Sequence, residues 1–305
     1  TTPTDYSTHP VAGVSWYGAV KFCNWLTLDQ GMHPTQRCYR EDVASNPSGW
    51  RPQTIAAGAW LTRDLNDDEH AALVADYRGY RLPLDDGYNN ALAGSDAADS
   101  YNEWYKAAAW NDTLRQNTIH GFGRNAITGP DANFRCSGDP FETVGDCAQG
   151  GTTPVGYFDG SVKTASFTSL ADANGFGLFD MTGNLHQWMQ GRYAPPTTID
   201  RRALRGGSWS DASTSTALRN ASRPLFAAPG TLDPRIGFRV VRAEPDVTGD
   251  LNGDAQTNLA DLQGMLTCLG GPGVIQPPQC DSVDFDLDAD ADLRDAAAFQ
   301  RAMRP

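Results

Sequence analysis

The sequence predicts an α+β protein, in which a large loop-rich domain precedes a small all-α module. The 305 residues suit one large domain plus a small one. The 31 Gly and 19 Pro divide the chain into short elements. All eight Trp precede residue 210, so we expect the core of the large domain to be built on aromatic burial.

Two helices can be placed in the large domain from local patterns. The segment 15–26 predicts a helix that Ser15 caps, with Trp16 and Cys23 facing inward. The segment 104–110 predicts another helix. Farther along the chain, Gly183-Asn184 predicts a tight turn, because both residue types tolerate positive φ.

Charge is distributed unevenly along the chain. The net charge is −13, and the segment from Asp246 onward holds eleven Asp and three Arg. A negative chain without a basic stripe argues against binding to nucleic acid. No apolar run approaches the roughly 20 residues of a membrane helix, so no membrane span is expected. The excess of Asp in the tail indicates metal ligands, because short carboxylates suit tight loops.

The six cysteines fall into three pairs that are near in sequence: Cys23 with Cys38, Cys136 with Cys147, and Cys268 with Cys280. None forms a CxxC motif, which argues against structural zinc and thioredoxin-like chemistry. Local pairing predicts three disulfides and an extracellular or cell-surface location. The alternative is a set of buried thiols in a cytosolic protein.

Residues 250–261 have the spacing of a twelve-residue calcium loop. Calcium takes six to eight oxygen ligands, and a loop of this kind wraps them around one ion. The candidate ligands at positions 1, 3, 5, 7 and 12 are Asp250, Asn252, Asp254, Gln256 and Asp261, with Gln256 offering its backbone carbonyl.

Residues 284–295 repeat the same register with Asp at positions 1, 3, 5, 7, 9 and 12. The candidate ligands are Asp284, Asp286, Asp288, Asp290 and Asp295. Each loop leads into a short amphipathic segment that predicts a helix. The alternative, an acidic disordered tail, does not account for two loops in one register. Calcium is therefore the expected cofactor, and the module is expected to fold only with it.

The tail, 246–305, resembles a type I dockerin, a module with paired EF-hand-like loops. The resemblance lies in Asp at position 12 of both loops and in Gly253 at position 4 of the first. It implies a cohesin-like or other protein partner. Positions 10 and 11 hold Leu259-Ala260 and Leu293-Arg294 instead of the usual hydroxyl pairs. The resemblance therefore supports calcium binding more strongly than it supports cohesin binding.

The large domain, 1–243, resembles the formylglycine-generating enzyme (sulfatase-modifying factor) family. The motifs are His9-Pro10-Val11, Ser15-Trp16-Tyr17, Tyr80-Arg81-Leu82-Pro83, Glu103-Trp104-Tyr105-Lys106, Thr153-Pro154-Val155-Gly156, Phe176-Gly177-Leu178-Phe179-Asp180-Met181-Thr182-Gly183-Asn184, Arg205-Gly206-Gly207-Ser208-Trp209 and Ile236-Gly237-Phe238-Arg239-Val240. The resemblance implies a C-type-lectin-like fold. It also implies first strands upstream of His9, so the domain is expected to be truncated at its N-terminus.

The chain departs from the family where the enzyme holds copper. The family has two cysteine ligands, five residues apart, shortly after the Gly-Gly-Ser motif. Here the stretch 206–219 contains no Cys, and Asp211 and Thr216 stand near those positions. Copper(I) prefers soft sulfur ligands. An active formylglycine-generating oxidase is therefore not expected.

The resemblance also implies calcium sites in the large domain. Asn133 and Asp146 are candidate ligands of one site. The alternative is a turn Asn and a solvated Asp. A second site usually has Glu where this chain has Gln187, and the lost charge should weaken cation binding.

The resulting hypothesis is a calcium-binding pseudoenzyme in which the large domain binds a peptide or a carbohydrate. Its candidate ligand-binding residues are His186, Ser208, Asp211 and Arg219. One alternative is an oxidoreductase of the same family with a different metal site. Another is a structural surface or matrix component without a ligand.

Overall fold

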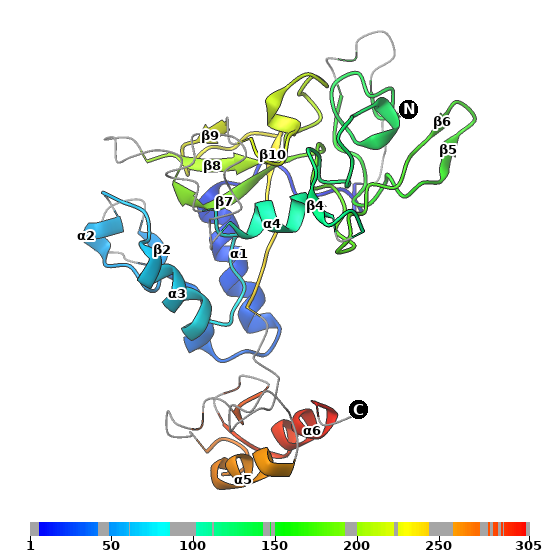
Figure 1. Ribbon diagram of the computed structural model, residues 1–305. Coiled ribbons are helices and arrows are strands. Elements are labelled where there is room, and N and C mark those ends of the chain that lie inside the picture. The colour runs from blue at the N-terminus through cyan, green and yellow to red at the C-terminus, as the bar shows by residue number, and fades with distance from the viewer. Residues whose placement is uncertain are drawn as a thin grey trace. The chain divides into compact units, whose positions relative to one another are not determined.

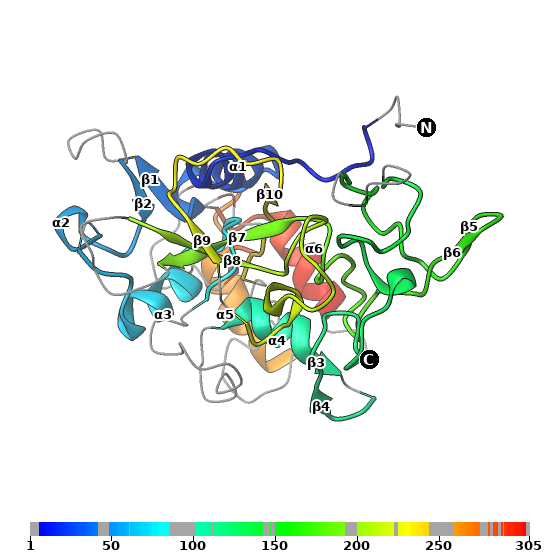
Figure 2. The ribbon, with the colours of Figure 1, turned by 90° about the horizontal axis from the view of Figure 1, so that it is seen from above.

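The computed structural model describes residues 6–41, 49–60, 62–85, 102–111, 113–142, 147, 150–192, 200–222, 225–243, 259–274, 280, 283–285, 288 and 290–302. The chain forms two compact units. The first unit comprises 1–20, 56–66 and 82–240, and the second comprises 21–55, 67–81 and 241–305. Each mixes helices, strands and loops (Figures 1 and 2).

The first unit is built around a four-stranded sheet in the order β10-β7-β8-β9. β10 pairs parallel with β7, and the other two pairs are antiparallel. These strands are β7 (His186–Arg192), β8 (Arg202–Arg205), β9 (Leu225–Ala227) and β10 (Ile236–Gly237). The other elements are α2 (Ala57–Trp60), α4 (Glu103–Ala109), β3 (Trp110–Asn111), β4 (Gln116–Asn117), β5 (Val162–Thr164), β6 (Phe167–Thr168), η3 (Gly129–Asp131) and η4 (Thr216–Leu218).

Every residue of β7 is buried, as expected for a strand covered on both faces. α4 lies beside the sheet (Figure 1), and its Trp104 and Ala108 share an apolar cluster with Met189 and Ala203 of the strands. Trp16 lies at the start of α1 (Trp16–Asp29), and its indole Nε1 donates to the Met189 carbonyl at 3.1 Å. Aromatic burial against β7 therefore ties these helices to the sheet.

The local patterns explain where the helices begin. The Ser15 hydroxyl accepts the Gly18 amide at 3.1 Å, so Ser15 caps α1 as predicted. The Asn102 side chain accepts the Tyr105 amide at 3.1 Å and caps α4. The prediction of these two helices is confirmed.

The second unit contains the remainder of α1, two short strands and the tail helices. The elements are η1 (Pro34–Gln36), β1 (Tyr39–Glu41), β2 (Trp50–Pro52), α3 (Asp67–Asp76), α5 (Leu259–Cys268) and α6 (Leu293–Ala302). Within the tail, one apolar cluster comprises Met265, Cys268, Cys280, Val283, Phe285, Ala291 and Phe299. This cluster packs the two helices onto the described part of the second acidic loop.

Two of the three predicted disulfides are present, and the third is wrong. Cys136 bonds to Cys147, and Cys268 bonds to Cys280. Cys23 and Cys38 are buried thiols. Burial, followed by the neighbouring Cys38, raises the pKa of the Cys23 thiol far above its ordinary value. Proximity in sequence predicted a bond between them, whereas in the structure the Cys38 thiol donates to the Gly79 carbonyl at 3.2 Å.

A buried ion pair in the first unit should be costly to break. Arg205 Nη2 and Nε donate to the Asp85 carboxylate at 2.6 and 3.2 Å, and both side chains are shielded from solvent. Asp85→Ala leaves a buried guanidinium charge, so the free energy of unfolding should fall by about 3–5 kcal/mol in denaturant titrations. Asp233→Ala breaks a pair with half-exposed Arg235 and should cost less than about 1 kcal/mol. Equal losses would contradict this assignment.

Candidate functional site

Three of the four predicted ligand-binding residues of the large domain lie together beside β7. Asp211 Oδ2 lies 3.1 Å from His186 Nε2 and accepts the Ser208 hydroxyl at 2.9 Å. The same oxygen accepts the Ser208 amide at 2.9 Å. The other oxygen accepts the Ser215 hydroxyl at 3.4 Å. Asp211 therefore closes the loop after the Gly-Gly-Ser motif.

The order of these groups decides what the cluster can do. In a nucleophilic triad the imidazole lies between the hydroxyl and the carboxylate. Here the Asp211 carboxylate lies between Ser208 and His186, so these contacts give Ser208 no imidazole base. Burial raises the pKa of Asp211, but hydrogen bonds and charge from His186 and hydrogen bonds from Ser208 outweigh it and lower the pKa. The carboxylate is ionised and committed to the loop.

Arg219, the fourth predicted residue, makes its described contacts away from this cluster. It is exposed, and it follows η4, where its amide donates to the Thr216 carbonyl. Its charge contributes to a lowered pKa of His120, whose main cause is burial. Thr216 itself is exposed at the start of η4. The predicted ligand-binding residues therefore divide between a closed Asp211 loop and an exposed turn.

The Gly183-Asn184 turn lies next to the loop and has the predicted left-handed backbone, with φ of 80° and 61°. A Cβ on Gly183 would come within 2.3 Å of the Asn133 carbonyl, so only Gly fits. The Asn133 side-chain amide donates to the Gly151 carbonyl at 2.9 Å. Its predicted calcium partner, Asp146, lies outside the described residues.

Gln187 is an acceptor at the centre of the first unit, a role that the sequence did not reveal. Its Oε1 accepts Trp104 Nε1 at 2.7 Å and Arg239 Nε at 2.8 Å. Its Nε2 donates to the Asp180 carbonyl at 2.9 Å. The amide thus serves as a neutral connector, and its oxygen is occupied by two protein donors.

A nearby pocket of about 320 Å³ is lined by Pro10, Val155, Gly177, Leu178, Phe179, Asp180, Asn184, Leu185, Gln187, Phe238 and Arg239.

Two carboxylates lie close together beside this pocket. The Asp180 amide donates to Asp172 Oδ2 at 3.2 Å, and Asp180 Oδ2 accepts the Gly156 amide at 2.9 Å. Asp172 Oδ1 is buried without a hydrogen-bond partner in the described structure. Burial, followed by the charge of Asp180, raises the pKa of Asp172 to about 8. Burial raises the pKa of Asp180 as well, so the protonated form is favoured in this pair.

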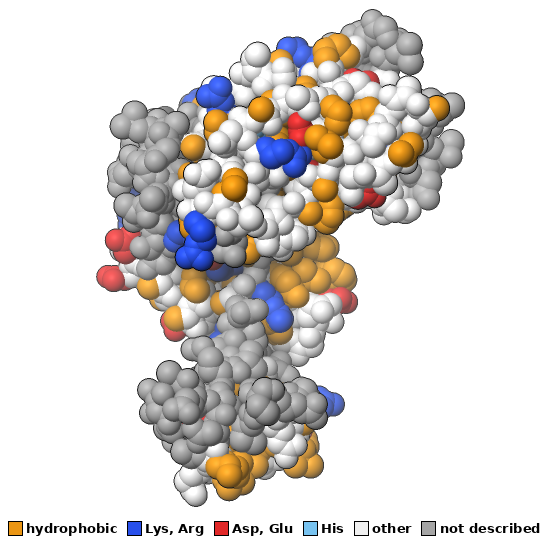
Figure 3. All heavy atoms as spheres, turned by 45° about the vertical axis from the view of Figure 1, so that its right-hand side comes forward, with side chains coloured by type: hydrophobic (Ala, Val, Ile, Leu, Met, Phe, Trp, Pro, Cys, Tyr) orange, Lys and Arg blue, Asp and Glu red, His pale blue; other side chains and the backbone are white. Residues whose placement is uncertain are grey.

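A second pocket, of about 600 Å³, is rich in aromatic side chains. It is lined by Glu103, Tyr105, Lys106, Ala107, Trp110, Asn117 and Phe176. The Asn174 side chain accepts the amides of Phe176 and Leu178 and donates to the Ala107 carbonyl at 2.7 Å. This fixed turn holds the Phe176 ring more than half exposed. Figure 3 shows hydrophobic side chains reaching the surface on one face.

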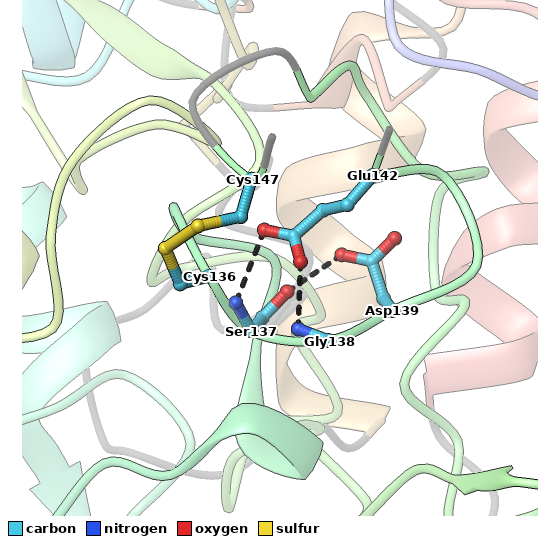
Figure 4. Close-up of a disulfide and its surroundings, with 6 residues drawn as sticks. All are labelled: Cys136, Ser137, Gly138, Asp139, Glu142 and Cys147. Carbon is cyan, nitrogen blue, oxygen red and sulfur yellow. Dashed lines mark hydrogen bonds between the residues drawn. A yellow bond between two sulfur atoms is a disulfide. The ribbon is translucent and has the colours of Figure 1, made fainter. Parts of the chain in front are cut away.

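The loop around the Cys136–Cys147 disulfide is held by carboxylates (Figure 4). Glu142 accepts the amides of Ser137 and Gly138 at 3.1 and 2.8 Å, and Asp139 accepts the Ser137 hydroxyl at 2.7 Å. Burial raises the pKa of both carboxyls. The disulfide and these bonds together hold the described segment 136–142.

In the tail, the described part of the second acidic loop brings three carboxylates together. One oxygen from each of Asp290, Asp292 and Asp295 lies within 4.8 Å of the others, and all three are buried. Asp292, at position 9, was not among the predicted ligands, although its place in the repeat identifies it. The Asp284 side chain accepts the Asp288 amide at 3.1 Å within the same loop. Asp286 and the first-loop candidates Asp250, Asn252, Asp254 and Gln256 lie outside the described residues. Asp261 lies in α5 and is buried.

Comparison with known proteins identifies the family. Residues 1–244 match the sulfatase-modifying factor enzyme 1-like domain. The chain belongs to this family. It is 22% identical to the chaperone protein LppX of Paenibacillus barcinonensis over 237 residues, 77% of this chain and 70% of LppX. It is 30% identical to the inactive C-alpha-formylglycine-generating enzyme 2 of Mus musculus over 83 residues, 27% of each chain. The crystal structure of CarF covers 79% of this chain and 69% of CarF, with 24% identity and a TM-score of 0.49.

The loop after the Gly-Gly-Ser motif, which Asp211 closes, does not fit the copper site that the family resemblance implies. The donors in that loop are the Asp211 carboxylate and hydroxyl groups, with the His186 imidazole beside it. Copper(I) prefers thiolates. Cys23 is buried with a raised pKa, which disfavours the thiolate form that binds metal.

None of the described helices is long and apolar enough to cross a membrane.

The raised pKa of Asp172 predicts a specific pH dependence of stability. Asp172 ionises near pH 3.8 when the chain is unfolded and near pH 8 when it is folded. The stability that it contributes is therefore complete below pH 3.8 and is lost as pH rises towards 8. Asp172→Asn cannot ionise, so its free energy of unfolding should fall less than that of the wild type between about pH 5 and about pH 9. One pKa unit corresponds to about 1.4 kcal/mol.

Urea titrations across that range measure the effect, and Asp159→Asn is the matched control. Asp159 is solvent-exposed, and hydrogen bonds from Lys163 and Ser161 lower its pKa, so its ionisation lies below the range tested. The control should follow the wild-type profile. A profile for Asp172→Asn that also runs parallel to the wild type would contradict the assignment.

Proposed function

We propose that this protein is a non-catalytic member of the sulfatase-modifying factor family, in which the family domain is a binding scaffold and the tail is a calcium-dependent docking module. The scaffold would bind a peptide or a carbohydrate, and the tail a cohesin-like or other protein. We place the protein outside the cell or on its surface, because two disulfides are typical of oxidising compartments.

The observation that carries the first half of this proposal is the Asp211 loop. A hard carboxylate stands near the position where the family enzyme holds a soft ligand. This carboxylate is occupied by donors from Ser208 and Ser215 and lies against His186. Carboxylate and hydroxyl oxygens cannot supply the thiolate coordination that the family chemistry uses. The loop is better suited to holding the scaffold closed than to oxidation.

The names of two relatives agree with a non-catalytic role. The mouse relative is described as inactive, and the bacterial relative is described as a chaperone. A chaperone contacts polypeptide, so a peptide is the ligand class that this likeness favours for the family domain. The inference is carried by the loop chemistry, and the relatives add to it.

The aromatic pocket beside α4 supports a ligand-binding role. Its volume of about 600 Å³ falls within the range of about 300–1,000 Å³ usual for ligand sites. Phe176, Tyr105 and Trp110 supply apolar surface, while Glu103 and Asn117 add polar groups. The fixed Asn174 turn keeps the Phe176 ring in place, so little ordering is needed on binding.

The cluster of three carboxylates in the tail supports calcium binding. Asp290, Asp292 and Asp295 bring negative charge into a small buried volume. Asp290 Oδ1 is buried and accepts no hydrogen bond from the described residues. Such an oxygen costs free energy unless a cation or donor reaches it. Calcium suits this site because it takes carboxylate oxygens in flexible geometry.

Elemental analysis of the purified protein tests the loss of copper chemistry. We expect calcium without stoichiometric copper or iron after exposure to each metal and desalting, because the family loop offers no thiolate. The same protein should leave a sulfatase-derived cysteine peptide unoxidised, with a family enzyme that holds both cysteines as the positive control. One copper per chain together with conversion of the peptide would overturn the non-catalytic assignment.

Calorimetric titration of the full chain tests calcium binding. We expect two binding events, one for each loop, and Asp295→Ala should abolish the event of the second loop because it removes the position-12 carboxylate. Asp159→Asn changes an exposed carboxylate in the first unit and should leave both events unchanged. No heat of binding at millimolar calcium would sink this half of the proposal.

A further inference from the structure

The linker that follows α5 is closed by a disulfide. Cys268 is the last residue of α5, and its sulfur bonds to Cys280 twelve residues later, with the two Cα atoms 5.5 Å apart. Both cysteines are buried in the apolar cluster of the tail, together with Phe285 and Phe299. The bond therefore fixes both ends of the linker to the core on which the second acidic loop rests.

The described part of this linker donates three backbone hydrogen bonds to the second acidic loop. The amides of Gly270 and Gly271 donate to the Ala291 carbonyl at 3.0 and 3.3 Å. The Gly273 amide donates to Asp290 Oδ2. Gly271 and Gly273 have φ of 91° and 75°, a region that favours glycine. The described part of the linker thus lies against positions 7 and 8 of the loop.

These contacts determine how Asp290 presents its carboxylate. The linker occupies Oδ2, while Oδ1 is buried without a hydrogen-bond partner in the described tail. Only 6% of Asp290 is exposed to solvent, and it belongs to the group formed with Asp292 and Asp295. A side chain held at one oxygen has lost most of its rotational freedom. The other oxygen is then available to a cation at no further ordering cost.

We propose that the linker closed by Cys268–Cys280 positions Asp290, so that formation of this disulfide raises the calcium affinity of the second loop. This inference rests on the proposed calcium function of the tail. Gly270, Gly271 and Gly273 are positioning residues, since they act through Asp290 and Ala291. Without the disulfide, calcium binding must also order the linker, and that entropy cost reduces the affinity.

The test compares full chains that differ only in one disulfide. Cys268→Ser with Cys280→Ser removes the linker bond, and Cys136→Ser with Cys147→Ser removes the disulfide of the first unit as the matched control. In calcium calorimetry, the linker variant should bind calcium at the second loop roughly tenfold to a hundredfold more weakly. The control should bind like the wild type. Circular dichroism at saturating calcium should give equal helix content in all three chains.

A second set of measurements tests the contact between the linker and Asp290, first in a chain that retains the disulfide and then in a double-mutant cycle. Asp290→Ala removes the acceptor of the Gly273 amide, so hydrogen exchange at that amide should accelerate while exchange in α5 stays slow. The combined Asp290→Ala and double-serine chain should lose less affinity than the sum of the separate losses, because both changes act on one contact. Unchanged exchange at Gly273, or additive losses, would overturn the proposal.

The outcomes separate this inference from the function on which it rests. If no chain binds calcium, the proposed function of the tail fails, and the linker has no calcium site to position. If wild type and linker variant bind calcium equally at the second loop, calcium binding stands and the positioning role is wrong. If the control loses as much affinity as the linker variant, the effect is general destabilisation, and the positioning role is again wrong.

Discussion

Strand β7 brings several polar side chains into the interior of the first unit, and much of that unit is arranged around them. Buried polar groups are costly unless they are hydrogen-bonded. Gln187 accepts hydrogen bonds from Trp104 and Arg239 and donates one to the Asp180 carbonyl. His186 lies against Asp211. At the far end of the strand, the Arg192 amide donates to Asp64 at 2.6 Å. The loops therefore approach β7 at positions set by its polar residues.

This constraint also explains why the altered family loop remains ordered. Asp211 serves the fold by closing its own loop and by contacting His186 on β7. The bond from Ser215 extends this closure towards η4. A carboxylate that accepts these donors gives the loop an internal anchor without a metal. The scaffold can therefore keep the family architecture with other donors at the place where family members bind copper.

The features that sequence analysis recovered are local ones. Ser15 caps α1 because a hydroxyl at that position reaches an amide three residues away, and Gly183-Asn184 turns because these residues tolerate positive φ. Gln187 was interpreted only as the loss of a glutamate. Its partners lie 83 and 52 residues away, and no local pattern encodes such contacts. The thiol state of Cys23 and Cys38 is non-local in the same way, because the packing of the folded chain, and not their spacing in sequence, decides whether they bond.

The first unit and the tail differ in how the charges of their carboxylates are compensated. In the first unit, Asp85, Asp131 and Asp233 each pair with an arginine, and Asp139 and Asp211 accept hydroxyl and amide donors. The segment from Asp246 onward has eleven Asp but three Arg, so protein cations cannot match its charge. Arg294 reaches Asp288 at 3.7 Å and is largely exposed, which makes that pair weak. The buried carboxylates of Asp290, Asp292 and Asp295 accept backbone amides, which carry no full charge, and the proposed calcium ion would balance the negative charge that remains.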